Sequence, residues 1–189
     1  MNFLEEAYEA VDALDLDDPV LMCEELGDVL MQVAFHTCME QETGRFTWEQ
    51  VCDGVCQKLI ERHPNIFGTQ PGYEGITDWD ALKNKEKGRR TLADDLESVP
   101  RAMPALMRAA KLQKRAARHG AALQGADAAA LADAAENLQT AQPASAQAEQ
   151  AVGELLFAAA NLARQAGVDP EQALQKANEA FCTATGPVA

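Results

Sequence analysis

The stretch from Leu21 to Val33 most limits how this chain can fold. Apolar side chains in and just after it cover most of a helix's circumference, namely Leu21, Met22, Leu26, Val29, Leu30, Met31, Val33, Ala34 and Phe35. We expect other elements to surround a helix of this kind, so it is predicted to be mostly buried. Glu25 and Asp28 nevertheless lie three residues apart on it and share one face. This pair of carboxylates on a predicted buried helix requires an explanation.

The rest of the sequence predicts an all-α protein. Alanine is abundant, aromatic residues make up 5% of the chain, and no long alternating β-branched run occurs. Apolar periodicity, N-caps and glycine or proline stops predict helices at residues 3–14, 20–42, 48–63, 78–87, 105–119, 146–166 and from 170 onward. Residues 121–151 are interpreted as weakly specified helix with a break near Pro143, and the basic side of helix 105–119 as a solvated face or a domain connector.

Charge and cysteine content limit the partners and the compartment. The first 44 residues contain twelve Asp and Glu and no Lys or Arg, so they carry −12 of the net charge of −14. Such a segment repels nucleic acid and suits divalent cations. The sequence contains no run of 18 apolar residues, so no membrane span is predicted. The five cysteines show no CxxC spacing. We therefore expect a cytoplasmic protein that binds neither membrane nor nucleic acid.

An internal repeat predicts two copies of one helical unit. Residues 26–31 (LGDVLM) correspond to residues 152–157 (VGELLF), and residues 48–50 (WEQ) correspond to residues 170–172 (PEQ). We expect one domain at residues 1–97 and a second, degenerate domain at residues 98–189. The second copy lacks most of the charges of the first, because Ala151, Glu154, Ala180 and Ala184 correspond to Glu25, Asp28, Lys58 and Arg62.

Two acidic pairs in the first copy suggest a metal site. Glu6 and Glu9 lie three apart on the first helix, as Glu25 and Asp28 do on the second. In an antiparallel hairpin the four carboxylates would converge, which is unfavourable unless a hard cation such as Mg²⁺ neutralises them. The alternative is a solvated acidic face, which is common on helices.

Cationic and aromatic residues extend this site toward phosphate. Lys58 and Arg62 lie four residues apart on the third predicted helix, and Trp79 and Lys83 lie four apart on the fourth. Lys and Arg neutralise phosphate oxygens, and Trp stacks on a nucleobase or simply packs. Together with the acidic pairs, these residues indicate a site for a nucleotide polyphosphate.

Three segments resemble the MazG family of nucleoside triphosphate pyrophosphohydrolases. They are residues 4–9 followed by 25–28, with the ExxE and ExxD pattern, residues 58–67 (KLIERHPNIF) and residues 104–113 (PALMRAAKLQ). The resemblance implies a tandem all-α homodimer that hydrolyses nucleoside triphosphates between the α and β phosphates with Mg²⁺, or alternatively Mn²⁺. It implies metal ligands at Glu6, Glu9, Glu25 and Asp28. It further implies catalytic roles for Glu5 and Glu25, and nucleotide contacts from Lys58, Arg62, Trp79 and Lys83.

Two departures from the family pattern leave a second hypothesis open. The family's opening Cys-Pro-Trp-Asp segment is absent before the first acidic helix, and the second copy has lost its acidic pairs. Any catalysis is therefore expected in the first copy. The alternative is a weakly active or inactive helical protein that dimerises or binds nucleotide.

Overall fold

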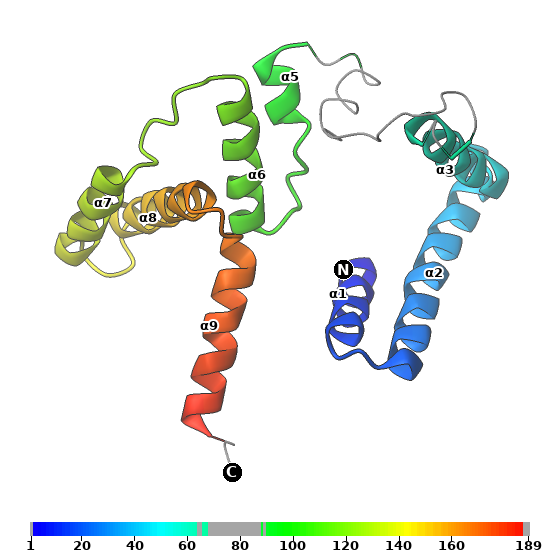
Figure 1. Cartoon of the computed structure of the whole chain (residues 1–189), viewed down its shortest axis with the longest axis horizontal. Coiled ribbons are helices and arrows are strands. Elements are labelled where there is room, and N and C mark those ends of the chain that lie inside the picture. Colours follow the sequence, from blue (N-terminus) through cyan, green and yellow to red (C-terminus); the bar gives the residue numbers. More distant parts are fainter. Residues whose placement is uncertain (1, 64–65, 68–87, 89, 187–189) are drawn as a thin grey trace. The chain divides into compact units, whose positions relative to one another are not determined.

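A computed structural model describes residues 2–63, 66–67, 88 and 90–186. The described residues form helices joined by turns, which confirms the all-α prediction (Figure 1). The predicted helix at 78–87, with Trp79 and Lys83, lies outside the described residues. The chain divides into two compact units, residues 1–78 and residues 79–189. The tandem division at residues 97/98 stays a prediction.

The first unit contains α1 (Asn2–Asp15), α2 (Pro19–Glu42) and α3 (Trp48–Arg62). The α1–α2 connection is short because Asp17 adopts a positive φ of 54° and Asp18 caps α2 at once. The Asp18 carboxylate accepts hydrogen bonds from the backbone N–H groups of Val20 and Leu21, at 2.9 and 3.1 Å. This turn brings α1 back along α2 as a helical hairpin. The capping box predicted for α3 is confirmed between Thr47 and Gln50.

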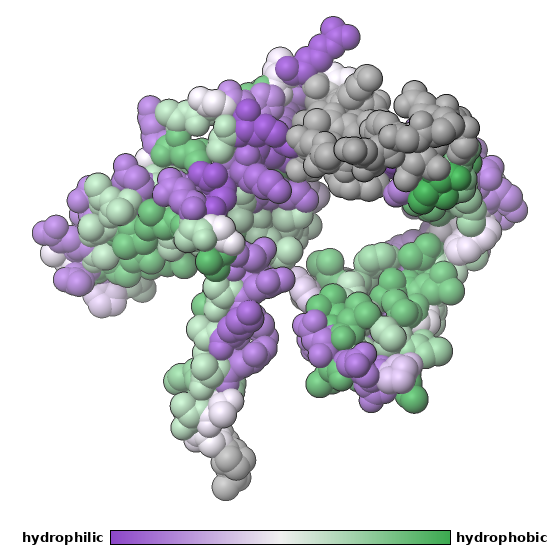
Figure 2. All heavy atoms as spheres, in the orientation of Figure 1, coloured by the Kyte–Doolittle hydropathy of each residue, from purple (hydrophilic) through white to green (hydrophobic). Residues whose placement is uncertain are grey.

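The prediction that α2 is mostly buried is wrong. Leu30 and Phe35 are 58% and 63% exposed, and Thr37 is the one residue of α2 that is buried. The reason is that α2 has too few neighbours to cover all its sides. Among the described helices, α1 and α3 are those that contact it. Figure 2 shows apolar side chains gathered on the visible face of this unit, which leaves a surface that a partner could cover.

The second unit contains a short helix and four longer ones. They are α5 (Leu92–Glu97), α6 (Ala105–Arg118), α7 (Ala128–Thr140), α8 (Ala146–Gln165) and α9 (Pro170–Thr185). α8 contacts α6, α7 and α9, and it packs closely on α7 because alanines occupy the interface. Ala134, Ala151 and Ala158 are at most 2% exposed. None of the described helices of either unit has the length and apolar character that a membrane crossing requires.

Polar contacts hold α5 and α6 together in this unit. Asp95 is 1% exposed, and its carboxylate lies 3.0 Å from Arg115, 3.3 Å from Arg118 and 3.1 Å from His119. Arg115 also donates to the Ser98 hydroxyl and to the Asp95 carbonyl. The basic side of α6 is therefore not simply solvated, because Arg115 is buried in an ion-pair network.

Candidate metal centre on the first helical hairpin

Three carboxylates come together between α1 and α2. Glu6 from α1 and Glu25 and Asp28 from α2 each offer one oxygen, and these oxygens all lie within 4.8 Å of one another. All three residues are half-buried. The two acidic pairs therefore meet across the hairpin, although Glu9 is not a member of this close trio.

The hairpin positions the trio through small buried residues on α1. Ala10 and Ala13 are 6% and 0% exposed, so the α1 backbone can approach α2 closely. Gln32 lies one turn beyond Asp28, and its Nε2 donates to Glu6 Oε1 at 3.4 Å. Gln32 was missed by the sequence reasoning, although its spacing of four residues from Asp28 placed it on the same face.

The carboxylates raise one another's proton affinity. Loss of solvent raises the pKa of Glu9 above its usual value, and the charges of Glu6 and Glu5 raise it further. Loss of solvent likewise raises the pKa of Glu25, with added effects from Glu9 and Asp28. Glu25 Oε2 is shielded from solvent and has no hydrogen-bond partner among the described residues. The site is therefore electrostatically unfavourable as it stands and would gain from a bound cation.

The donor set fits a hard divalent cation. Every ligand offered is a carboxylate oxygen, which Mg²⁺, Mn²⁺ and Ca²⁺ prefer over nitrogen or sulfur ligands. Oε2 of Glu25 has no hydrogen-bond partner among the described residues, so a cation would satisfy it. Glu6, Glu25 and Asp28 would hold such an ion, with Glu9 close enough to act on Glu25 electrostatically.

Of the other predicted site residues, Glu5 lies beside the acidic cluster, and Lys58 and Arg62 lie on a different helix. Glu5 is exposed on α1 and acts electrostatically on Glu9. On α3, Lys58 is exposed and Arg62 is half-buried. Lys58 forms no hydrogen bond or ion pair with a described residue, so it does not contact the trio in this way. Trp79 and Lys83 lie outside the described residues.

The matching hairpin of the second unit has no such cluster. Ala151, which corresponds to Glu25, is 2% exposed and packs in the α7–α8 interface. Glu154, which corresponds to Asp28, is exposed and accepts a hydrogen bond from Gln150 on its own helix, at 2.8 Å. Over the described part of the second unit, no three metal-ligating side chains gather. The α7–α8 hairpin thus packs without such a group of acids.

The clustered carboxylates lead us to expect that a divalent cation stabilises the first unit against unfolding. Glu9 and Glu25 hold protons more strongly when folded, so they favour the folded state below their ordinary pKa, and this contribution is lost as the pH rises through the raised values. At pH 7 without metal, the ionised carboxylates of the cluster still repel one another. Mg²⁺ at about 100 times its Kd should therefore raise the melting temperature of the first unit by about 10–20 °C, measured by calorimetry.

A matched variant separates metal binding from general salt effects. Glu25→Gln removes one negative charge, so it should raise the melting temperature of the metal-free protein and abolish most of the Mg²⁺-induced rise. NaCl at equal ionic strength serves as the control for screening. An unchanged Mg²⁺ response in Glu25→Gln would show that the ion binds elsewhere.

The fold and this site define an all-α protein with a carboxylate cluster suited to a divalent cation. Residues 1–67 match the MazG nucleotide pyrophosphohydrolase domain. The chain is 39% identical over 187 residues to the nucleoside triphosphate pyrophosphohydrolase of Escherichia coli strain K12, an alignment that covers 94% of this chain and 71% of that protein. It is 38% identical over 180 residues to the nucleoside triphosphate pyrophosphohydrolase/pyrophosphatase MazG of Thermotoga maritima, which covers 94% and 69%.

A shorter similarity is found in another bacterium. The chain is 36% identical over 121 residues to the nucleoside triphosphate pyrophosphohydrolase of Mycobacterium tuberculosis, which covers 62% of this chain and 36% of that protein. The alignments with the first two relatives extend over nearly the whole chain. The chain belongs to the MazG family of nucleotide pyrophosphohydrolases.

Proposed function

We propose that this chain hydrolyses nucleoside triphosphates between the α and β phosphates, giving a nucleoside monophosphate and pyrophosphate. Membership of the MazG family gives the class of reaction. The observation that carries the proposal is the meeting of Glu6, Glu25 and Asp28 within 4.8 Å across the α1–α2 hairpin. The α7–α8 hairpin packs with Ala151 at the position that corresponds to Glu25, so a hairpin of this kind does not require the acids. Their presence in the first unit therefore supports a catalytic role.

The proposed mechanism assigns the ion to the carboxylates of the hairpin. Glu6, Glu25 and Asp28, with Glu9 beside them, would hold Mg²⁺ or Mn²⁺. When bound, the ion supplies charge neutralisation for the triphosphate oxygens during transfer. Glu5 is exposed beside the cluster and outside the close trio, so its carboxylate is free to orient the attacking water and accept its proton. Glu25 is the second candidate for that base.

The direct test is pyrophosphate release. The purified full chain is incubated with a mixture of nucleoside triphosphates and Mg²⁺, and monophosphate and pyrophosphate are separated and quantified. Monophosphate and pyrophosphate in equal amounts support the proposal. Release of inorganic phosphate with a diphosphate product would contradict it. The non-catalytic alternative is not favoured, because the first hairpin keeps its carboxylate trio.

Lys58 and Arg62 are proposed to bind the triphosphate from α3. They share one face of the helix, since they lie four residues apart. Removing either charge should raise KM for the nucleotide about tenfold or more, because charge-assisted hydrogen bonds to phosphate are lost. Steady-state kinetics of Lys58→Ala and Arg62→Ala measure this effect. Gln57→Ala, at an exposed neighbouring position, is the control. A KM unchanged in both charge variants would remove α3 from the site.

We also propose that two copies associate through the exposed apolar face of the first unit. Leu26, Leu30, Met31 and Phe35 on α2 are each at least 50% exposed. A surface with this many large apolar side chains is unfavourable in water and is typical of an interface. A homodimer would cover α2, which the described helices of this chain leave open.

A further inference from the structure

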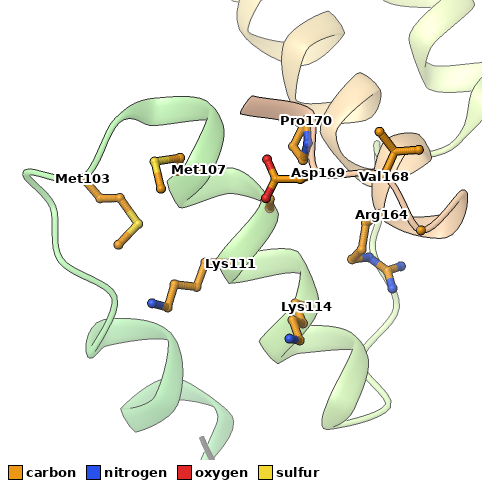
Figure 3. A pocket seen from close by; sticks show the side chains of 10 residues that line it. Met103, Met107, Lys111, Lys114, Arg164, Val168, Asp169 and Pro170 are labelled. Carbon is orange, nitrogen blue, oxygen red and sulfur yellow. The ribbon is translucent and has the colours of Figure 1, made fainter. Parts of the chain in front are cut away.

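A pocket in the second unit lies away from the hairpin position where the repeat has lost its acids. It has a volume of about 500 Å³ and is formed where α6 meets the end of α8 and the start of α9 (Figure 3). Glu154, the repeat counterpart of Asp28, is not among its lining residues. The pocket is therefore not a remnant of a second metal site, and its size falls within the range of small-molecule sites.

Three cations line this pocket. Lys111 and Lys114 come from α6 and Arg164 comes from α8 (Figure 3). Neither lysine forms a hydrogen bond or an ion pair with any residue that the structure describes. This gathering of positive charge stands out on a chain with a net charge of −14. Uncompensated cations around one cavity attract an anion.

Buried polar contacts fix the direction of the arginine. Asn161 is 2% exposed, and its Nδ2 donates to the Ala126 carbonyl at 2.6 Å. Its Oδ1 accepts from Arg164 Nε at 2.9 Å. This contact uses the inner nitrogen of the guanidinium and leaves both Nη groups without a described partner. A guanidinium held in this way is preorganised to bind phosphate with both Nη groups.

Among the described lining residues there is one carboxylate, Asp169, and its own helix engages it. Asp169 Oδ1 accepts from the N–H groups of Glu171 and Gln172, both at 3.0 Å, and so caps α9. The described lining thus holds three cations and one carboxylate, and the lone pairs of that carboxylate are partly used. Met103 and Met107 form an apolar wall on one side of the pocket, and Val168 lies on the other side (Figure 3). The pocket therefore combines a phosphate-binding side with a surface against which a base can pack.

We propose that this pocket binds a polyphosphate anion, either as the phosphate chain of a nucleotide or as free pyrophosphate. Lys111, Lys114 and Arg164 contact the phosphates, and the methionine wall accepts a base when one is attached. The site is distinct from the carboxylate trio, and binding there requires no divalent cation. It gives the second unit, which has lost its acidic pairs, a ligand of its own.

The test is calorimetric titration of the full chain after all divalent ions have been removed by dialysis. The probes are inorganic pyrophosphate and an adenosine triphosphate analogue with a methylene bridge between the α and β phosphorus atoms. We expect one binding event per chain. The double variant Lys111→Ala/Lys114→Ala should lower the affinity at least tenfold. The single variant Lys114→Glu, at an exposed position, should also lower the affinity. Tighter binding of the analogue than of pyrophosphate identifies the nucleotide as the ligand, and equal binding identifies pyrophosphate.

Two control variants locate the binding event. Lys176→Ala removes an exposed lysine of the same unit outside the pocket, and Glu25→Gln alters the carboxylate trio. Both should bind the probes as the unmodified chain does. Absence of binding without metal, or equal affinity in the double lysine variant, would overturn the proposal. Because no turnover is measured, these results do not depend on whether the chain hydrolyses nucleotides.

Discussion

Pyrophosphate release should fall roughly a thousandfold when Glu25 is replaced with alanine. Glu25 contributes one of the three clustered oxygens, and its Oε2 has no hydrogen-bond partner among the described residues. Its loss removes a ligand from the proposed cation, which would neutralise charge on the triphosphate oxygens during hydrolysis. The measurement is the initial rate of pyrophosphate formation at saturating nucleoside triphosphate and Mg²⁺.

An exposed acid on the same helix is the matched control for this change. Glu42 is the last residue of α2 and lies outside the trio. Glu42→Ala should retain the rate of the unmodified chain, since it removes one charge from α2 but no ligand. Release that persists undiminished in Glu25→Ala would exclude the hairpin as the catalytic centre.

The largest loss of stability is expected from Asp95→Ala in the second unit. Asp95 is 1% exposed and pairs with Arg115, Arg118 and His119. Removing one member of a buried ion pair leaves the other charges uncompensated and costs about 3–5 kcal/mol. The melting temperature of this unit should fall by about 10–20 °C, as measured by calorimetry.

Glu97→Gln is the control for Asp95→Ala because it changes an exposed charge on the same helix. Its effect should stay within about 0.5 kcal/mol. Equal stabilities of the Asp95 and Glu97 variants would mean that the α5–α6 ion pairs contribute no net stability. That outcome would leave apolar packing as the cause of the α5–α6 contact.

Local signals predicted most helix bounds within a residue or two. The sequence placed a helix at residues 20–42, and α2 spans Pro19–Glu42 because Asp18 caps it and Gly44 follows its end. α5 was missed since it is only six residues long, although Thr91 and Asp94 form a capping box that could have indicated it. Within the weakly specified stretch, α7 begins after Asp127, which caps the N–H of Ala130.

Tertiary neighbours were harder to predict than helices. The periodicity of α2 shows apolar side chains around most of the helix but not which face has a neighbour within the chain, so burial was overestimated. Helical spacing placed Glu25 and Asp28 on one face, and the short turn at Asp17 made convergence with Glu6 predictable. The register and rotation of α1 against α2 decide which acids share the closest group, so the absence of Glu9 from the 4.8 Å trio required coordinates.

The continuity of the hairpin has a consequence for how the protein folds during synthesis. The tertiary contact between Glu6 and Gln32 spans only 26 residues, so the whole carboxylate site is encoded locally. Short sequence separation costs little loop-closure entropy and favours rapid formation, and amino-terminal segments leave the ribosome first. The α1–α2 hairpin can therefore assemble before the second unit has been translated. A divalent cation captured at that stage would act as a template, because it offsets the repulsion that opposes closure of the hairpin.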